Sequence, residues 1–167
     1  MAKRRRLTHV APGGSPRMVD VGAKPVTRRA AVAEAWVTLG AEAAALLRRT
    51  GAVAKGNVLE TARLAGIAAA KHTALLIPLC HPIPLDHVEV RASLLGRRVH
   101  IQTKVAAEAK TGVEMEAMTA AAVAALTVYD MVKSAGKGAH IGPVRLLEKA
   151  GGKSGAWRRG EDDDGAR

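Results

Sequence analysis

Residues 29–39 read RAAVAEAWVTL, and the structure assigned to this stretch decides the fold. Its alanines favour a helix, whereas the alternation of side chains from Val32 to Thr38 is typical of a half-buried strand. The residues of the stretch leave both structures open. Its neighbours along the chain therefore have to be considered.

Two helices are predicted downstream. Residues 41–49, AEAAALLRR, combine strong helix formers with a basic last turn, and Gly51 follows as a C-terminal stop. Residues 57–71, NVLETARLAGIAAAK, begin with Asn57 as an N-cap, and Glu60 three residues later predicts a capping box. An apolar stripe at helical spacing follows in this second helix.

The remainder of the chain predicts a loop, a hairpin, a long helix and a last strand. Three prolines exclude a helix in residues 76–85, LIPLCHPIPL, and indicate an ordered loop. Alternating side chains predict strands over residues 88–93 and 99–105, joined by a turn at residues 95–97. Residues 113–133 predict a long alanine-rich helix, and residues 141–147 a last strand.

If residues 29–39 form a strand, the order of elements is β-α-α-β-β-α-β. This is the split βαβ pattern of a ferredoxin-like fold. We therefore expect an α+β sandwich, in which an antiparallel four-stranded sheet has its helices packed on one face. A chain of 167 residues has the length of one domain.

The composition limits the core and the compartment. The chain has 34 alanines, no phenylalanine and three aromatic residues, Trp36, Tyr129 and Trp157. The core must therefore be built from small side chains, with close packing of backbones or burial against other subunits as compensation. No membrane-spanning segment or secretory signal is expected. The single cysteine, Cys80, agrees with a reducing compartment, so a cytoplasmic location is expected.

The net charge of +11 is unevenly distributed. Residues 1–17 carry five basic and no acidic side chains, and we expect a disordered basic arm. Residues 158–167 carry three basic and four acidic side chains, and we expect a disordered tail. A single catalytic domain is expected over residues 18–157, with 18 basic and 11 acidic side chains. Because aromatic side chains for base stacking are scarce, no specific nucleic acid partner is expected.

Several polar residues in the predicted domain allow both a structural and a functional interpretation. Asp130 and Lys133 lie three apart and can form an ordinary surface ion pair, or a proton-transfer pair if they are buried. Lys55 lies just before a helix N-terminus, where an anion is favoured. Cys80 and His81 belong to no metal-ligand spacing, so no metal site is expected. Glu114 and Glu116 point in different directions on a helix, so at most one should face a given ligand.

Four stretches carry a resemblance to a known family: MVDVGAK (residues 18–24), KGNVLETARLAGIAAAKHTALLIPLCHPIPLDHVEV (55–90), KTGVEMEAMTAAAVAALTVYDMVK (110–133) and IGPVRLLEKAGGKSG (141–155). Together they closely resemble the cyclic pyranopterin monophosphate synthases, the molybdenum cofactor biosynthesis protein C family. The resemblance runs from about Met18 to Gly155 and leaves the arm and the tail outside. Stretches of this length are far more specific than a short motif.

The resemblance implies a lyase that converts 3′,8-cyclo-7,8-dihydro-GTP to cyclic pyranopterin monophosphate and releases diphosphate, in molybdenum cofactor biosynthesis. It implies a ferredoxin-like protomer, a homohexamer built as a trimer of dimers, active sites at subunit interfaces, and no metal or organic cofactor. The implied catalytic residues are Asp130, Lys55 and Lys133. The implied substrate-binding residues are Leu79, Cys80, His81, Met115, Glu116, Glu114, Arg29, Lys149 and Lys153.

The charge of the predicted domain suits this reaction. A triphosphate substrate carries several negative charges, and lysine, arginine and acidic side chains can supply proton transfers and stabilise a leaving diphosphate. The alternative is a non-catalytic basic oligomer that binds nucleotides or RNA. The basic arm favours this alternative, and the scarcity of aromatic side chains opposes it.

Overall fold

The computed structural model describes residue 10 and residues 13–53 and 56–160. Residues 29–38 of the ambiguous stretch lie in a strand, which settles the alternative that the sequence leaves open. This strand, β1 (Thr27–Thr38), lies inside a sheet of order β4-β5-β1-β6-β7 whose neighbours are all antiparallel. The other strands are β4 (His87–Leu95), β5 (Arg98–Ala109), β6 (His140–Ala150) and β7 (Trp157–Arg158).

The predicted fold class is confirmed, with one difference in the number of strands. The four long strands β4, β5, β1 and β6 have the order of a ferredoxin-like sheet. The sheet has five strands rather than four, because the chain turns back after β6 and the two residues of β7 pair with Glu148 and Lys149. The glycine-rich stretch 151–155 forms this turn. The sequence alone does not show whether such a stretch turns back to the sheet or leads out of the fold.

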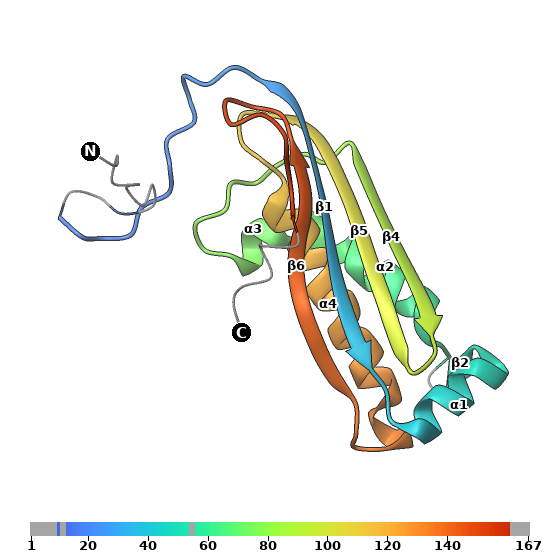
Figure 1. Ribbon diagram of the computed structural model, residues 1–167. Helices are drawn as coiled ribbons and strands as arrows, with labels where there is room; N and C mark the ends of the chain where they lie inside the picture. The colour runs from blue at the N-terminus through green and yellow to red at the C-terminus, as the bar shows by residue number, and fades with distance from the viewer. Residues whose placement is uncertain (1–9, 11–12, 54–55, 161–167) are drawn as a thin grey trace.

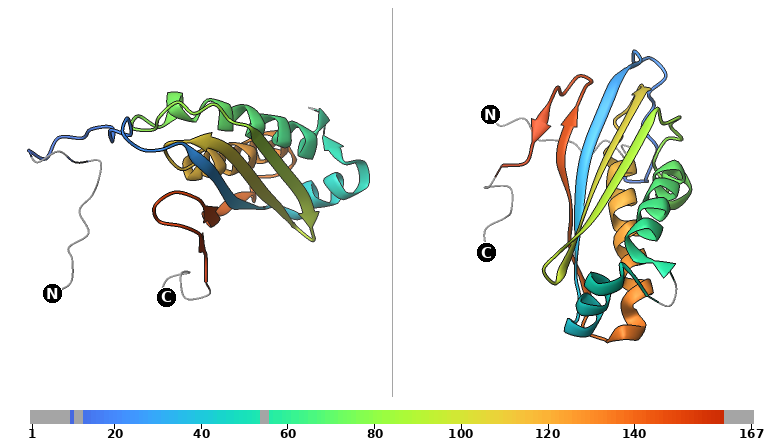
Figure 2. Two further views of the ribbon diagram at one scale, coloured as in Figure 1. Left: turned by 90° about the horizontal axis from the view of Figure 1, so that it is seen from above. Right: turned by 90° about the vertical axis from the view of Figure 1, so that its right-hand side faces the viewer.

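Helices cover one face of this sheet (Figures 1 and 2). The helices α2 (Val58–Lys71) and α4 (Glu114–Val132) pack against each other and against the strands. The shorter helices are α1 (Ala41–Thr50), α3 (Thr73–Leu76) and the 3₁₀ turn η1 (Lys133–Ala135). A separate ribbon of two short strands, β2 (Ala52–Val53) and β3 (Gly56–Asn57), precedes α2.

The predicted helix boundaries agree closely with the structure. Helix α1 ends at Gly51, which has the left-handed conformation expected of a C-terminal stop. The Asn57 side chain accepts a hydrogen bond of 3.1 Å from the Glu60 amide and so forms the predicted N-cap of α2. The Glu60 carboxylate is bonded to Arg63 at 2.8 Å.

The core consists largely of alanine and valine, as the composition requires. Every second residue of β1 from Ala31 to Val37 is buried beneath the helices, and so is one face of α4. That face of α4 is fully buried at Ala117, Ala120, Ala121, Ala124, Ala125 and Val128. Helix α4 is long and apolar enough to cross a membrane by length and composition, but 56% of its apolar window is buried inside the chain. Its hydropathy is accounted for by its place between α2 and the sheet.

The open face of the sheet carries a charged cluster. Glu34 on β1 is only 6% exposed and accepts hydrogen bonds from Arg145 at 2.7 Å and from His100 at 2.8 Å. Burial alone would raise the pKa of Glu34, but these two bonds together outweigh it and hold the pKa below its usual value. Trp36 stacks on His100 in the same cluster, and the Arg98 guanidinium lies over the Trp36 ring.

Gly66 of α2 lies directly against α4. A Cβ atom there would lie 3.0 Å from the Ala120 carbonyl oxygen and 3.3 Å from the Ala124 Cβ. We expect Gly66→Val to lower the free energy of unfolding by about 1–3 kcal/mol, because overpacking forces the two helices apart. Ala68→Val, at an exposed position of the same helix, is the matched control. Urea unfolding of both variants measures the difference, and equal effects would contradict this account of the packing.

Candidate functional site

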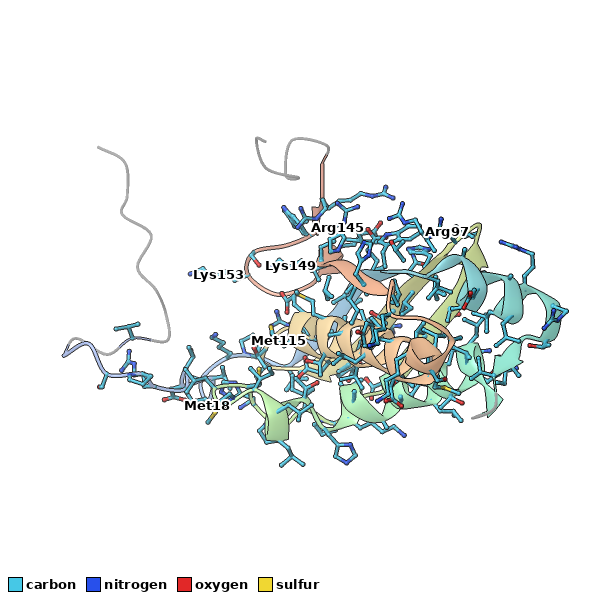
Figure 3. All side chains as sticks on the ribbon, turned by 90° about the horizontal axis from the view of Figure 1, so that it is seen from below. Met18, Arg97, Met115, Arg145, Lys149 and Lys153 are labelled. Atoms are coloured by element: carbon cyan, nitrogen blue, oxygen red, sulfur yellow. The ribbon has the colours of Figure 1, made fainter. Side chains whose placement is uncertain are left out.

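Two adjoining cavities lie where the N-terminus of α4 meets the end of β6. The smaller one has a volume of about 250 Å³ and the larger one about 800 Å³. They share Lys24, Thr111, Gly112 and Glu114 in their walls. Figure 3 shows Met115, Lys149 and Lys153 at this end of the molecule.

All nine predicted substrate-binding residues line these cavities. Around the smaller one lie Leu79, Cys80, His81, Glu114, Met115 and Glu116. Around the larger one lie Arg29, Glu114, Lys149 and Lys153. The residues come from β1, from the proline-rich loop, from the first turn of α4 and from the end of β6, which are far apart in the sequence.

The larger cavity is strongly basic. Five cationic side chains and one acidic side chain, Glu114, stand in its wall; the cationic ones are Lys24, Arg29, Lys110, Lys149 and Lys153. The hydroxyl-bearing residues Thr27 and Ser154 line it as well. Such a wall suits a ligand with several negative charges, because lysine and arginine neutralise phosphate oxygens and donate hydrogen bonds to them.

The glycine-rich loop after β6 closes over Arg29. Gly151 and Gly152 both have positive φ values, of 97° and 72°. A Cβ at Gly151 would overlap the Arg28 carbonyl oxygen, and one at Gly152 would overlap the Arg29 guanidinium. Only glycine therefore allows the loop to approach so closely. The loop also supplies Ser154, whose hydroxyl accepts a hydrogen bond of 2.8 Å from Lys149.

Lys149 is further held by an ion pair of 3.4 Å with Glu114. The end of β6 and the first turn of α4 are thereby joined across the larger cavity. An anion entering this cavity would meet an ammonium group that is already oriented by two partners.

The smaller cavity contains the only buried acid of this region among the described residues, Glu116. Its side chain is buried, the residue is 4% exposed, and its Oε2 atom has no hydrogen-bond partner in the described chain. Burial raises the pKa of Glu116, and the neighbouring Glu114 carboxylate raises it further. Glu116 is therefore a candidate proton donor.

Both Glu114 and Glu116 line the smaller cavity, and the prediction that at most one of them faces a given ligand stays a prediction. The cavity lies at the end of α4 rather than along its side. Side chains that leave the helix in different directions can therefore both reach it.

Cys80 and His81 have distinct properties in the smaller cavity. Burial, together with the Glu116 carboxylate, raises the pKa of the Cys80 thiol, which does not favour a thiolate nucleophile. The His81 Nε2 atom lies 2.7 Å from the Val19 carbonyl oxygen. Since a carbonyl oxygen only accepts, Nε2 donates this bond, and Nδ1 of the neutral ring remains an acceptor.

Asp130 and Lys133 lie elsewhere, at the other end of α4. Sixteen residues of helix separate Glu114 from Asp130, a rise of about 24 Å. Asp130 and Lys133 form an ion pair of 2.6 Å, with side chains 53% and 57% exposed. The burial that a proton-transfer pair would need is therefore not provided within the protomer. The hydrogen bond and charge of Asp130 raise the pKa of Lys133.

Lys55, the third predicted catalytic residue, lies outside the described residues. Its neighbours Val53 and Gly56 pair across the short ribbon that leads into α2. Since α2 and α4 run in opposite directions, this ribbon lies at the same end of the molecule as Asp130 (Figure 1).

Sequence reasoning left several residues of these cavities out of the predicted site, among them the cationic Lys24 and Lys110 and the hydroxyl-bearing Ser154. All three lie within the stretches that carry the family resemblance. Their cationic and hydroxyl side chains within those stretches are the signal that could have found them. Among the described residues, no three His, Cys, Asp or Glu side chains gather closely enough to hold a metal ion. That the protein has no metal site stays a prediction.

Comparison with known proteins shows the family of the chain. The sequence profile of the MoaC family matches residues 18–152, which include all of α4 and every residue that lines the two cavities except Lys153 and Ser154. The chain belongs to the MoaC family. This membership confirms the resemblance found in the sequence.

Two curated relatives within the MoaC family illustrate the similarity. The cyclic pyranopterin monophosphate synthase of Thermomicrobium roseum is 55% identical over 160 residues, which cover 95% of each chain. The cyclic pyranopterin monophosphate synthase of Deinococcus radiodurans is 53% identical over 156 residues, which cover 93% of this chain and 92% of the relative.

The buried position of Glu116 leads to a dependence of stability on pH. Because burial raises its pKa in the folded state, its contribution to stability is complete below about pH 4.5 and is lost as the pH rises through the raised pKa. We expect the free energy of unfolding to fall less above pH 4.5 in Glu116→Gln than in the unchanged protein. Urea unfolding over a pH series measures this, with Glu42→Gln, an exposed position on α1, as the control. Parallel pH curves for the unchanged protein and Glu116→Gln would refute the assignment.

Proposed function

We propose that this protein is a cyclic pyranopterin monophosphate synthase of molybdenum cofactor biosynthesis. It is a lyase that converts 3′,8-cyclo-7,8-dihydro-GTP to cyclic pyranopterin monophosphate and releases diphosphate. The observation that carries the proposal is the pair of adjoining cavities, one with five cationic side chains and one with a buried acid, in a chain of the MoaC family. The wall chemistry of both cavities suits a nucleoside triphosphate.

The two cavities suit different parts of this substrate. In our proposal, the triphosphate lies in the larger cavity against Arg29, Lys149 and Lys153, and the base lies in the smaller cavity beside His81 and Glu116. Protonated Glu116 donates a proton during ring opening, and the cationic side chains stabilise the leaving diphosphate. Leu79, Cys80, Met115 and Glu114 complete the walls. These assignments rest on the positions of the side chains around the cavities.

Asp130, Lys133 and Lys55 are proposed as the catalytic residues. The ion pair with Asp130 favours the charged form of Lys133, so Lys133 is suited to stabilise phosphate. About 24 Å of helix separates this pair from the cavities within one protomer. We therefore propose that each active site is composite, with Asp130 and Lys133 of one subunit facing the cavities of another.

A composite site requires an oligomer, and we propose a homohexamer built as a trimer of dimers. Two observations support assembly. The side chains of Asp130 and Lys133 are each about half exposed, so another subunit can contact them. The apolar side chains Leu75 and Leu76 of α3 are also exposed, next to the proline-rich loop, and a subunit contact would bury them. The proposed enzyme is cytoplasmic, with a catalytic domain over residues 18–157 between a basic arm over residues 1–17 and a tail over residues 158–167. Most residues of the arm and of the tail lie outside the described residues, and Arg158, the first residue of the tail, lies in β7.

The catalytic proposal predicts the behaviour of Asp130→Asn. We expect turnover of the cyclic dihydro-GTP substrate to fall by about 10²–10⁴-fold, because a proton-transfer group and the partner of Lys133 are lost. Mass detection of cyclic pyranopterin monophosphate and diphosphate measures the reaction. Undiminished turnover by the intact oligomer would remove Asp130 from the mechanism, and no product from the unchanged oligomer would refute the proposed function.

A mixing experiment tests the composite site. Asp130→Asn and Arg29→Ala subunits are each expected to be inactive alone. If the two residues act across a symmetric interface, unfolding and reassembling an equal mixture restores about one quarter of the normal activity. About half of the reassembled pairs are mixed, and one of the two sites in each mixed pair is intact. The reassembled single variants are the controls. An inactive mixture that contains mixed oligomers would show that both residues serve one subunit's own site.

For the alternative function, a basic module that binds RNA, Trp36 offers no free stacking surface. Trp36, the aromatic residue on the central strand β1, is already engaged by His100 and Arg98. Most of the basic arm lies outside the described residues.

Deletion of residues 1–15 separates the two functions. We expect the shortened enzyme to keep its turnover, because both cavities are lined by residues from Val19 onward. An RNA-binding module would instead lose affinity, since the deletion removes four of the basic side chains of the arm. Turnover and RNA binding of the two chains are compared at one salt concentration. A large loss of turnover would contradict the expectation.

A further inference from the structure

The segment Val19–Lys24, which leads into β1, forms one wall of the smaller cavity and the boundary to the larger one. It contains no helix or strand, and most of its residues are exposed. Two local hydrogen bonds shape it: the Gly22 amide donates to Asp20 Oδ1 at 2.8 Å, and the Lys24 amide donates to the Val21 carbonyl oxygen at 3.1 Å. These bonds form a turn, but they do not attach it to the rest of the molecule.

Two side chains from distant parts of the chain provide that attachment. His81 Nε2 donates to the Val19 carbonyl oxygen at 2.7 Å, and Lys110 Nζ donates to the Gly22 carbonyl oxygen at 2.7 Å. His81 already belongs to the proposed substrate-binding residues. Lys110 has no role assigned to it, although it is 88 positions away from the residue it binds.

Lys110 is well placed to act as an anchor. It directly follows β5, which is paired with β1 and β4 along most of its length. Its backbone is therefore held by the sheet, and its ammonium group transmits that rigidity to Gly22. An ammonium group has three donors, so Lys110 can hold the carbonyl oxygen and still face the larger cavity, whose wall it shares.

The residue that gains from this anchor is Lys24. It lies two positions after Gly22, and its side chain lines both cavities. If the turn were free, the cation of Lys24 would have to be ordered each time a ligand binds. Ordering a flexible segment at the moment of binding opposes affinity, and an anchored segment avoids this loss.

We propose that Lys110 is a positioning residue of the substrate site. It fixes the turn Val19–Lys24 so that the ammonium group of Lys24 stands between the two cavities before the anionic substrate arrives. This inference rests on the proposed function for its ligand, a nucleoside triphosphate, and on the hydrogen bonds of the turn for its mechanism.

The first experiment measures the turn itself by hydrogen–deuterium exchange of the full-length oligomer without substrate. Lys110→Met removes the donor and keeps the length of the side chain, and Lys110→Arg keeps a cationic donor. We expect the amides of Gly22 and Lys24 to exchange at least about tenfold faster in Lys110→Met, and close to normally in Lys110→Arg. Lys104→Met, which changes an exposed lysine on the preceding strand β5, is the matched control.

The second experiment measures kinetics in Lys110→Met, Lys24→Met and the double variant. Loss of a hydrogen bond from a charged group corresponds to a change of about tenfold or more in a binding constant. We therefore expect KM to rise by this factor, with a smaller change in kcat. Because Lys110 acts through Lys24, the double variant should be no worse than Lys24→Met alone. Lys110→Arg should recover most of the loss, and Lys104→Met should leave both constants unchanged.

Unchanged exchange of the Gly22 and Lys24 amides in Lys110→Met would overturn the anchor. Additive losses in the double variant would overturn the positioning role, because Lys110 would then act as an independent charge. If Lys110→Met does not assemble, Lys110→Gln takes its place with the same expectations. Failure of the proposed function is recognised separately, since the exchange experiment needs no turnover and the unchanged protein would then form no product.

Discussion

The close contact of α4 with the sheet and with α2 is the interaction on which the rest of this structure depends. Its buried face consists mainly of alanine, and the facing side chains of β1 are alanine and valine. Small side chains let backbones approach closely, and Gly66 of α2 extends this approach to the second helix. Without phenylalanine, the chain has few large groups to bury, so the core stabilises the fold by the tightness of its packing.

The same helix determines the arrangement of the site. Its N-terminus faces two cavities that combine a basic wall with a buried acid, and its C-terminus carries an ion pair of Asp130 and Lys133. A rigid helix cannot bring its own ends together. The proposed chemistry therefore depends on a second subunit, and the exposure of the Asp130–Lys133 pair in the protomer agrees with that requirement.

Much of the fold could be predicted because its signals are local. The Asn57 cap, the Gly51 stop and the alternating hairpin depend on residues close in sequence. The ambiguous stretch 29–39 is different. Alanine suits both a helix and a strand, and the stretch becomes a strand because β5 and β6 pair with both of its edges. The fifth strand was missed for a similar reason, since two residues carry no periodicity of their own.

The sequence by itself determined the family, the fold class and the residue types of the site, because long matching stretches and a basic domain are visible without coordinates. Only the tertiary structure decided which of those residues meet. It gathered the nine predicted binding residues around two cavities and added Lys24 and Lys110, while it placed Asp130 and Lys133 at the far end of α4. The physical reason is that spatial neighbours here come from strands and loops far apart in the sequence, such as Gly22 and Lys110, which are 88 positions apart, and such contacts leave no periodic trace in the sequence.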